Sequence, residues 1–267
     1  MIYLGVAGWP VAHSRSPAMH NAALAAVGLD GWRYVRLPLP PARFAETVRA
    51  LPEAGFRGIN VTIPHKEAAV AVADAVSHTA AAVGAANTIT FEPDGTVHAD
   101  NTDVIGLLAS LPRDPAGTTA LVLGAGGAAR AAVYALRSAG AAEVLVWNRT
   151  RERAERLVAA LGGRVVDAVP QVELVVNCTS VGLHDADLPF KSLPLPADTV
   201  GVGSCVVDMV YRPGGTRLLA AAKQRGATVV DGLEILVAQG AASFARWTDR
   251  TAPLEVMRRA VADVATR

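Results

Sequence analysis

The sequence has 267 residues, of which 51% are hydrophobic and 18% are charged, and its formal net charge is +1 at pH 7. A chain of this length can bury a sizeable core in one or two domains, and its near-neutral charge gives no general attraction to nucleic acid or membranes. No apolar run reaches transmembrane length, the first residues do not resemble a signal peptide, and two cysteines make no disulfide framework, so we expect a cytoplasmic protein without membrane or nucleic-acid partners.

The first hundred residues predict an alternation of strands and helices. Strands are expected at 2–7, 32–37 and 58–62, and helices at 17–27, 44–51, 64–75 and 76–83. Ser16 and Pro17 suit the N-cap and the first position of the first helix. Two further strands, 87–91 and 97–99, flank a Pro-Asp-Gly turn and predict a hairpin. A helix over 104–111 follows, with Asn101-Thr102-Asp103 at its start.

The segment 112–117 is the best linker candidate, because a strand, a glycine turn and an alanine-rich helix follow it at once. The turn is Gly124-Ala125-Gly126-Gly127-Ala128. This order is typical of the first unit of a dinucleotide-binding βαβ, in which the glycines let the backbone approach a pyrophosphate at the helix N-terminus. Taken alone the turn is weak support, since similar turns occur with no ligand.

The next predicted strand, 143–147, bears on the choice of cofactor. An NAD site has an acid about 20 residues beyond the glycines, where it holds the ribose 2′-hydroxyl. Here Asn148 stands at that position, Arg149 and Thr150 follow it, and Arg153 lies one turn further along. Two arginines and no acid favour a 2′-phosphate, so the sequence predicts NADP. The alternative is that these arginines only begin a solvated helix.

Beyond residue 150 strands and helices alternate strictly. A helix is expected at 151–161, strands at 164–166, 173–178 and 204–210, a helix at 215–225 and a strand at 227–230. This rhythm is typical of a parallel, doubly wound sheet. Two helical segments, 233–247 and 253–264, close the chain, and their pattern does not say where they pack.

Three polar clusters stand at predicted strand-to-helix junctions of the first hundred residues, where open α/β sheets bind ligands. They are Ser14/Ser16, Asn60/Thr62/Lys66 and Asn87/Asn101/Asp103. The two serines either cap a helix or donate hydroxyls to a carboxylate at a helix N-terminus. Asp103 has the same pair of interpretations, helix cap or functional acid.

Lys66 is more distinctive, because only three of the 25 Lys and Arg residues are lysine. It falls in the first turn of a predicted helix, where the helix dipole disfavours a cation. An ammonium can give up a proton, which a guanidinium cannot do at ordinary pH. Reduction of a ketone by hydride needs a proton for the developing alkoxide, and a lysine partnered by Asp103 could supply it and stabilise the charge.

The remaining reactive residues predict less. The six histidines show no metal-ligand spacing, so we expect no metal site. Cys178 ends an apolar strand and is expected to be a small buried residue rather than a nucleophile. Tyr211 and Gln239 lie just beyond late strands, and pattern alone does not single them out.

Together these segments resemble the shikimate dehydrogenase family along the whole chain. The matching segments are Gly8-x-Pro10-x-x-His13-Ser14-x-Ser16-Pro17-x-x-His20-Asn21, Asn60-Val61-Thr62-x-Pro64-x-Lys66, Gly84-Ala85-x-Asn87-Thr88, Asn101-Thr102-Asp103, the glycine turn with Asn148-Arg149-Thr150, Asp208-Met209-x-Tyr211-x-Pro213, and Gly232-Leu233-x-x-Leu236-Val237-x-Gln239. Trp9, Val104 and 98–100 depart from the family pattern without touching a motif residue, which puts fine substrate preference in doubt.

The resemblance implies an enzyme that reduces 3-dehydroshikimate to shikimate with NADPH. It implies an α/β substrate domain, 1–103 with 239–267, and a Rossmann-type domain, 104–238, with the C-terminal helices returning to the first. Lys66 and Asp103 would act on the reacting oxygen, and Gly232 would lie near the cofactor. Substrate contacts would come from Ser14, Ser16, Thr62, Asn87, Tyr211 and Gln239.

The sequence leaves two alternatives to this function open, and it does not fix the oligomeric state. Related proteins oxidise quinate, often with NAD, although Ser16 and Arg149 favour shikimate and NADP. A non-catalytic NADP-binding sensor on the same fold is a second alternative, against which the joint presence of Lys66 and Asp103 counts. We expect a monomer or a homodimer that acts on a small-molecule substrate.

Overall fold

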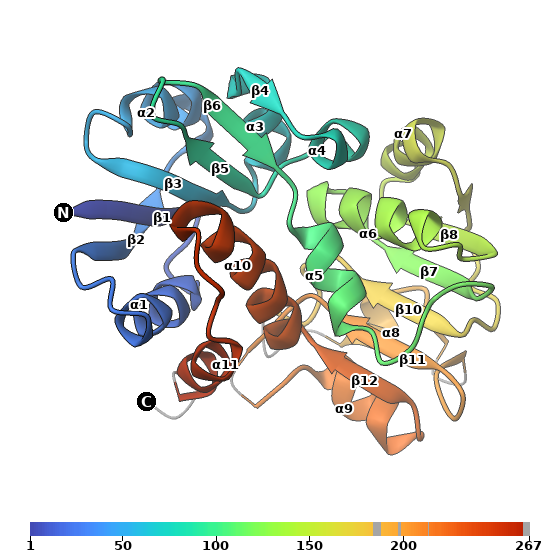
Figure 1. Ribbon diagram of the computed structural model, residues 1–267. Coiled ribbons are helices and arrows are strands. Elements are labelled where there is room, and N and C mark those ends of the chain that lie inside the picture. Colours follow the sequence, from blue (N-terminus) through green and yellow to red (C-terminus); the bar gives the residue numbers. More distant parts are fainter. Residues whose placement is uncertain (184–187, 197–198, 213, 264–267) are drawn as a thin grey trace. The chain divides into compact units, whose positions relative to one another are not determined.

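The computed structural model describes residues 1–183, 188–196, 199–212 and 214–263. The chain divides into two compact units, Met1–Gly106 with Leu236–Arg267, and Leu107–Ile235. Each unit has its own six-stranded sheet (Figure 1). The first division falls inside a helix, α5 (Asp103–Ser110), so the predicted linker 112–117 lies within the second unit. Among the described helices, none is both long and apolar enough to cross a membrane.

The sheet of the first unit mixes parallel and antiparallel pairs. Its strands are β1 (Ile2–Gly8), β2 (Trp32–Pro38), β3 (Phe56–Val61), β4 (Ala75–Val76), β5 (Thr88–Phe91) and β6 (Val97–Asp100), in the order β2-β1-β3-β5-β6-β4. β1 is parallel to β2 and β3, whereas β5 is antiparallel to β3 and β6, which confirms the hairpin. Because β5 is reversed, Asn87, which precedes it, lies at the carboxyl edge of β1 and β3.

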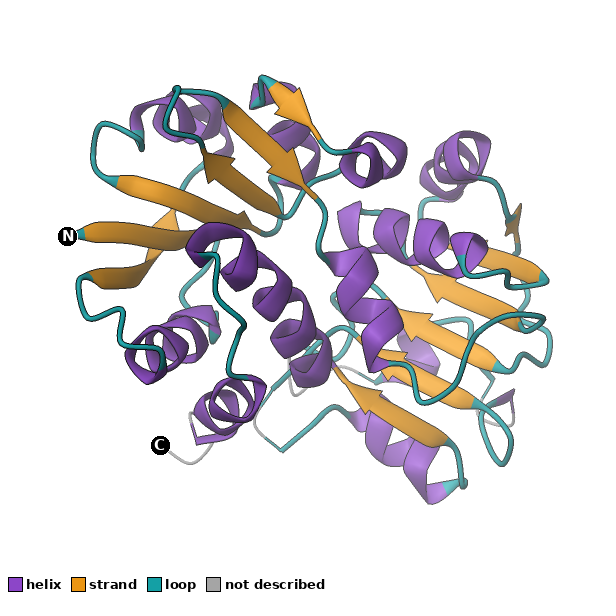
Figure 2. Ribbon diagram, viewed as in Figure 1, coloured by secondary structure: helices purple, strands orange, loops and turns teal. Residues whose placement is uncertain are grey.

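Helices cover both faces of this sheet (Figure 2). They are α1 (Ser16–Ala26), the 3-10 turn η1 (Pro41–Arg43), α2 (Phe44–Ala50), α3 (Lys66–Val72), α4 (His78–Val83), α10 (Gly232–Thr248) and α11 (Leu254–Asp263). Phe44, Ala69 and Ile89 belong to a buried core under α2, α3 and α4. α11 packs against α1, where Arg15 Nη1 donates to the Val261 carbonyl at 2.8 Å. The last two helices therefore complete the first unit.

The sheet of the second unit is entirely parallel. Its strands are β7 (Thr119–Leu123), β8 (Glu143–Trp147), β9 (Arg164–Val165), β10 (Leu174–Asn177), β11 (Cys205–Asp208) and β12 (Thr228–Asp231), in the order β12-β11-β10-β7-β8-β9. The chain steps outward from β7 to β9, returns to β10 and steps outward the other way. This is the doubly wound dinucleotide-binding order, with its switch point between β7 and β10.

The helices of the second unit are α6 (Gly127–Ser138), α7 (Arg151–Leu161), α8 (Pro189–Ser192) and α9 (Arg217–Gln224), in addition to the ends of α5 and α10. α6 and α7 pack on β7, β8 and β9, and α9 packs on β11 and β12. Because parallel crossovers are right-handed, the two directions of winding place α6 and α7 on one face of the sheet and α9 on the opposite face. The predicted strand 143–147 and helix 151–161 are confirmed with the same bounds.

Two local predictions are wrong in the first unit. The expected helix 64–75 begins only at Lys66 and ends at Val72, because the backbone of Asp74 bonds Val97 and the chain continues as β4 beside β6. A long-range strand pairing thus overrides local helix preference. The helix expected at 17–27 begins at Ser16, so Ser16 is not its N-cap. The Ser14 hydroxyl instead accepts from the Ser16 amide at 3.3 Å.

His20 of α1 is completely buried in the first unit. Its ring stacks on Tyr34, with centroids 4.3 Å apart, and lies beside Phe244 and Trp247. Within the described part of the chain, neither ring nitrogen has a hydrogen-bond partner. Burial lowers the pKa of His20 to about 3, and the nearby Asn60 side chain offsets only part of that shift. His20 is therefore neutral in the folded protein over a pH range in which it is charged in the unfolded chain.

Asp208, at the end of β11, is completely buried in the second unit. Its carboxylate accepts from Thr216 Oγ1 at 2.7 Å, Asn177 Nδ2 at 2.9 Å and the Val210 amide at 3.1 Å. Burial raises the pKa of Asp208 to about 6, because these three hydrogen bonds lower it by less than desolvation raises it. Between the ordinary pKa of an aspartate and about pH 6, Asp208 therefore holds a proton in the folded protein that it has released in the unfolded chain.

These two groups should give the protein opposing pH dependences of stability. Between about pH 4 and 6, His20 makes folding more favourable as pH rises and Asp208 makes it less favourable, each by about 1.4 kcal/mol per pH unit. Relative to wild type, the free energy of unfolding of His20→Phe should fall by about 2–3 kcal/mol from pH 4 to 6, and that of Asp208→Asn should rise similarly. Urea unfolding at three pH values checks this, with the exposed His78→Gln as control. Parallel pH curves for all variants would contradict it.

Candidate active site

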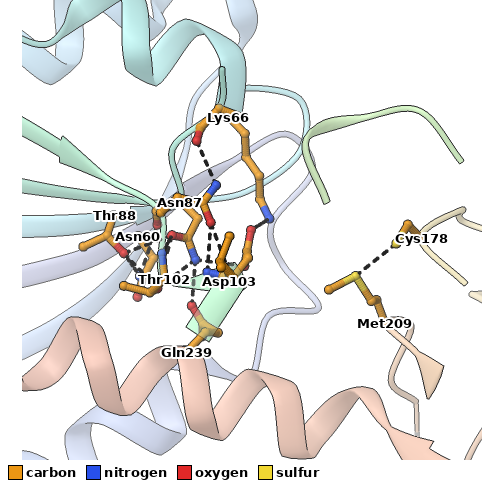
Figure 3. Close-up of polar contacts among 12 residues, drawn as sticks. Asn60, Lys66, Asn87, Thr88, Thr102, Asp103, Cys178, Met209 and Gln239 are labelled. Carbon is orange, nitrogen blue, oxygen red and sulfur yellow. Dashed lines mark hydrogen bonds and ion pairs between the residues drawn. The ribbon is translucent and has the colours of Figure 1, made fainter. Parts of the chain in front are cut away.

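Lys66 and Asp103 form an ion pair at the carboxyl edge of the first-unit sheet. Lys66 Nζ lies 2.5 Å from Asp103 Oδ2, with 15% and 9% of the two side chains exposed (Figure 3). Lys66 is the first residue of α3, and its carbonyl accepts from the Ala86 amide at 2.8 Å, which ties the lysine to the loop before β5. The ammonium is thus held against a single carboxylate with an open side toward solvent.

Asp103 is not the helix cap that its position suggested. The cap of α5 is Asn101, whose Oδ1 accepts from the amides of Asp103 and Val104 at 3.1 and 3.3 Å. This leaves the Asp103 carboxylate for side-chain partners. Asn87 Nδ2 donates to its second oxygen, Oδ1, at 2.9 Å. One oxygen of Asp103 therefore faces an amide and the other faces the ammonium.

Asn87 also connects the ion pair to α10. Its Nδ2 lies 3.0 Å from Gln239 Oε1 and 3.0 Å from Thr102 Oγ1, besides Asp103 (Figure 3). Gln239 Nε2 donates back to the Leu236 carbonyl of its own helix at 2.8 Å. The structure therefore brings together four residues predicted from separate segments, namely Lys66, Asn87, Asp103 and Gln239. We call these four residues the Asn87 cluster.

This arrangement depends on a close approach of α5 and α10. A Cβ built on Gly106 would stand 2.7 Å from Gln239 Cβ and 3.0 Å from its backbone nitrogen. Gly106 lies one helical turn beyond Asp103, so the same contact that lets the helices approach sets Asp103 near Gln239.

Gly106→Ala should therefore damage the site without unfolding the protein. The new methyl must push α10 from α5, and a displacement of about 1 Å in a catalytic arrangement can cost about 100-fold in rate. Steady-state kinetics measures the effect. Gly240→Ala is the matched control, because its Cβ would meet the flexible end of Met19 rather than backbone. If both variants keep wild-type kcat/KM, the crossing of the helices does not set the site.

Ser14 and Ser16 lie buried at the start of α1, with 5% and 4% exposure. Ser14 Oγ accepts from the Ser16 amide, and neither hydroxyl proton has an acceptor within the described residues. Arg36 Nη2 donates to the Ser14 carbonyl at 2.7 Å and brings a positive charge beside the serines. Two available hydroxyl donors near a guanidinium suit an anionic group.

Thr62 follows β3 and is half-buried. A Cβ on Gly8 would stand 2.4 Å from Thr62 Cγ2, so the methyl group occupies the space that Gly8 leaves open. The structure gives the Thr62 hydroxyl no partner among the described residues and does not join it to the Asn87 cluster.

In the second unit, the glycine turn follows β7 at the switch point. Gly124 has φ +115°, and a Cβ there would lie 3.2 Å from the carbonyl group of Cys178, so this residue needs to be glycine on both counts. Gly126 is the N-cap of α6, and the first helical bond runs from the Arg130 amide to the Gly126 carbonyl. The amides of Gly127 and Ala128 thus have no intrahelical acceptor, as an anion-binding helix N-terminus requires. Ala125 lies in the turn just before this helix.

The residues after β8 supply two uncommitted guanidinium groups. Asn148 Nδ2 donates to the Thr150 carbonyl at 2.8 Å, which closes the turn into α7. Arg151 is occupied by Glu155 and Asp167. In contrast, Arg149 and Arg153 are exposed and pair with no carboxylate in the described part of the chain. Both are therefore available for a phosphate.

Three other predicted residues belong to the second unit. Tyr211 is half-buried in the segment after β11. Gly232 begins α10, and a Cβ there would lie 2.8 Å from the Met209 carbonyl, so backbone packing alone accounts for this glycine. Cys178 is only half-buried, contrary to expectation, because it stands just past the end of β10, where its Sγ donates to Met209 Sδ at 3.4 Å (Figure 3).

Sequence reasoning missed three residues that the structure places at these sites. Thr102 bonds Asn87, Ser243 bonds Asn60 and the Gln239 carbonyl, and Arg36 holds the Ser14 carbonyl. Ser243 lies four residues after Gln239, so the helical period could have placed both on one face of α10. Thr102 and Arg36 carry no such local signal.

Comparison with known proteins gives matches along the chain. Residues 6–89 match the shikimate dehydrogenase substrate binding domain, residues 108–182 match shikimate / quinate 5-dehydrogenase, and residues 232–262 match the shikimate 5'-dehydrogenase C-terminal domain. The shikimate dehydrogenase (NADP(+)) of Methylobacterium radiotolerans is 46% identical, over 97% of this chain and 96% of that protein.

Solved structures are similar as well. The shikimate 5-dehydrogenase of Thermus thermophilus, in complex with NADP(H) and shikimate, is 42% identical with a TM-score of 0.88, over 99% of this chain and 100% of that one. The quinate dehydrogenase of Corynebacterium glutamicum, in complex with NAD, is 28% identical with a TM-score of 0.87, over 98% of this chain and 99% of that one.

Proposed function

The chain belongs to the shikimate dehydrogenase family, and we propose that it catalyses the reversible NADPH-dependent reduction of 3-dehydroshikimate to shikimate through Lys66 and Asp103. The observation that carries the catalytic assignment is the ion pair at 2.5 Å, in which both side chains are mostly buried. An acid beside an ammonium at the edge of the sheet can serve proton transfer to an oxygen that gains charge.

The proton steps follow from this pair. As hydride reaches the carbonyl carbon, Lys66 Nζ gives a proton to the carbonyl oxygen, which becomes a hydroxyl. Asp103 keeps the ammonium oriented toward that oxygen and stabilises its charge until the transfer. In the oxidation direction the neutral amine takes the proton back.

The second unit fits NADP by the groups it offers. The amides at the start of α6 would hold the pyrophosphate, and Arg149 with Arg153 would hold the 2′-phosphate, because both guanidinium groups are uncommitted. NADPH would supply the hydride when it is bound. We propose that the first unit binds the substrate and that the second unit binds the cofactor. The proposed cofactor contacts are Gly124, Ala125, Gly126, Gly127, Ala128, Asn148, Arg149, Thr150, Arg153 and Gly232.

The Asn87 cluster suits a substrate rich in hydroxyl groups. The Asn87 amide has two protons but three acceptors within 3.0 Å, namely Thr102 Oγ1, Asp103 Oδ1 and Gln239 Oε1. The amide therefore cannot give a full hydrogen bond to all three, and the Asp103 and Gln239 oxygens keep lone pairs with which they can accept from a ligand hydroxyl. We assign ring-hydroxyl contacts to Asn87, Gln239 and Thr62, and Tyr211 stays a proposed substrate contact.

The buried serines should bind the substrate carboxylate. Ser14→Ala and Ser16→Ala should each raise KM about tenfold or more with kcat little changed, since a hydrogen bond to a charged group is worth about 1.5–3 kcal/mol and this contact is the same in ground and transition states. Steady-state kinetics with 3-dehydroshikimate checks this. A lower melting temperature with an unchanged KM would assign the serines to α1 alone.

An absorbance assay at the nicotinamide band, crossing shikimate and quinate with NADP and NAD, tests the function. We expect shikimate with NADP to be the best pair. Turnover of quinate with NAD at an equal rate would instead indicate a quinate dehydrogenase activity, as in the similar protein of Corynebacterium glutamicum.

We also infer a cytoplasmic location. Both cysteines are free thiols, which is typical of proteins in a reducing compartment.

A further inference from the structure

Three buried hydroxyl groups lie in contact with one another on the side of Asn87 away from Lys66. Thr88 comes from β5, Thr102 from the segment before α5, and Ser243 from α10, and their exposures are 0%, 3% and 0%. Ser243 Oγ lies 2.8 Å from Thr88 Oγ1 and 3.2 Å from Thr102 Oγ1, and the two threonine oxygens are 3.2 Å apart. We call these three residues the hydroxyl cluster. It touches none of the reacting groups directly.

On either side of the cluster, the orientation of a side-chain amide is fixed by groups that can only donate or only accept. The Thr102 amide donates to Asn87 Oδ1 at 2.7 Å, so the Asn87 oxygen faces Thr102 and its nitrogen faces Asp103. On the other side, Asn60 Nδ2 lies 3.2 Å from the Asn87 carbonyl, so its nitrogen faces the cluster. Neither amide can be turned over without placing like groups together.

Between these two amides a path of donors leads from Tyr34 to Asn87. Tyr34 donates from its hydroxyl to Asn60 Oδ1 at 2.8 Å, and Asn60 Nδ2 reaches Ser243 Oγ at 2.9 Å and Thr88 Oγ1 at 3.3 Å. Each hydroxyl oxygen can accept from Asn60 and still donate its own proton. Ser243 donates to the Gln239 carbonyl at 3.1 Å, where that branch ends, and Thr88 donates to Asn87 Oδ1 at 3.2 Å.

We propose that Tyr34, Asn60 and Thr88 form a donor chain that ends, through Asn87, on the Asp103 carboxylate and positions it for Lys66. Each link polarises the next in a buried setting, so the Asn87 amide is a stronger and better-oriented donor than an isolated one. The chain keeps Asp103 Oδ1 occupied and thereby presents Oδ2 to the ammonium. These three are positioning residues, and the proposal rests on the catalytic roles of Lys66 and Asp103 given above.

The test compares three threonine variants. Thr88→Val removes the hydroxyl at nearly constant volume, and Thr88→Ser restores it. Thr90→Val is the matched control, because Thr90 lies two residues further on β5, is equally buried, and bonds Arg246 Nε at 3.2 Å instead of the chain. We expect Thr88→Val to lower kcat about tenfold, the loss of about one hydrogen bond, with KM within twofold.

Rescue by serine and the split between kcat and KM separate positioning from packing. Thr88→Ser should restore kcat, and Thr90→Val should keep the wild-type kcat, whatever its melting temperature. A wild-type kcat in Thr88→Val, or an equal loss of kcat in Thr90→Val, would overturn the proposal.

Two further variants keep the test decisive. If Thr88→Val does not fold, Tyr34→Phe removes the first donor of the chain and should lower kcat by a smaller factor with KM within twofold, and an unchanged kcat would overturn the proposal. Lys66→Ala is measured in parallel. If Lys66→Ala retains kcat, the catalytic assignment fails. If Lys66→Ala is impaired and the chain variants behave as wild type, only the donor chain fails.

Discussion

Replacing Lys66 by alanine should lower kcat by about 10²–10⁴, the usual contribution of a positioned acid–base group, with KM for 3-dehydroshikimate nearly unchanged. The reason is that the ammonium, 2.5 Å from Asp103 Oδ2, is the group placed to give its proton to the carbonyl oxygen. Stopped-flow or steady-state absorbance at saturating NADPH measures the effect.

Companion variants distinguish a proton donor from a charge clamp. Lys66→Arg should not rescue kcat, since guanidinium keeps its proton. Asp103→Asn should be similarly impaired, and the double variant should be little worse than either single one, because residues that act as a unit do not add. An arginine variant with near wild-type kcat would reduce Lys66 to a positive charge, and strictly multiplicative losses would separate the two roles.

Replacing Arg149 by alanine should weaken NADP binding by about 1–3 kcal/mol, the range for hydrogen bonds to a charged partner, and should change NAD binding little. Only NADP carries the 2′-phosphate, and the Arg149 guanidinium is exposed and pairs with no carboxylate among the described residues. Isothermal titration with both cofactors gives the two affinities directly.

The neighbouring Arg151 supplies the control. It is already engaged by Glu155 and Asp167, so Arg151→Ala should leave the ratio of NADP to NAD affinity unchanged. Arg149→Ala with Arg153→Ala should lower that ratio further than Arg149→Ala alone. Equal losses of NADP and NAD affinity in Arg149→Ala would mean that this residue does not contact the 2′-phosphate.

The sequence predicted the elements of the second unit better than the candidate site in the first unit. Strand 143–147 and helix 151–161 were expected with the bounds they have, and the glycine turn lies at the switch point of the sheet. These features depend on local properties, namely apolar periodicity and turn chemistry within about ten residues. Lys66 and Asp103 were also selected locally, from a rare residue type at a helix start.

What the sequence by itself determined, then, is most of the elements, the glycine turn and the arginines after β8, and it selected Lys66 and Asp103 as the candidate pair. Tertiary structure alone decided that Asn101, not Asp103, caps α5, that residues 75–76 form a strand, and that Thr102 bonds Asn87 and Ser243 bonds Asn60. The reversal of β5 and the return of α10 bring together residues as far apart as Asn60 and Ser243. Local periodicity carries no signal for such pairings, because it specifies which face of an element is buried and not which distant element covers it.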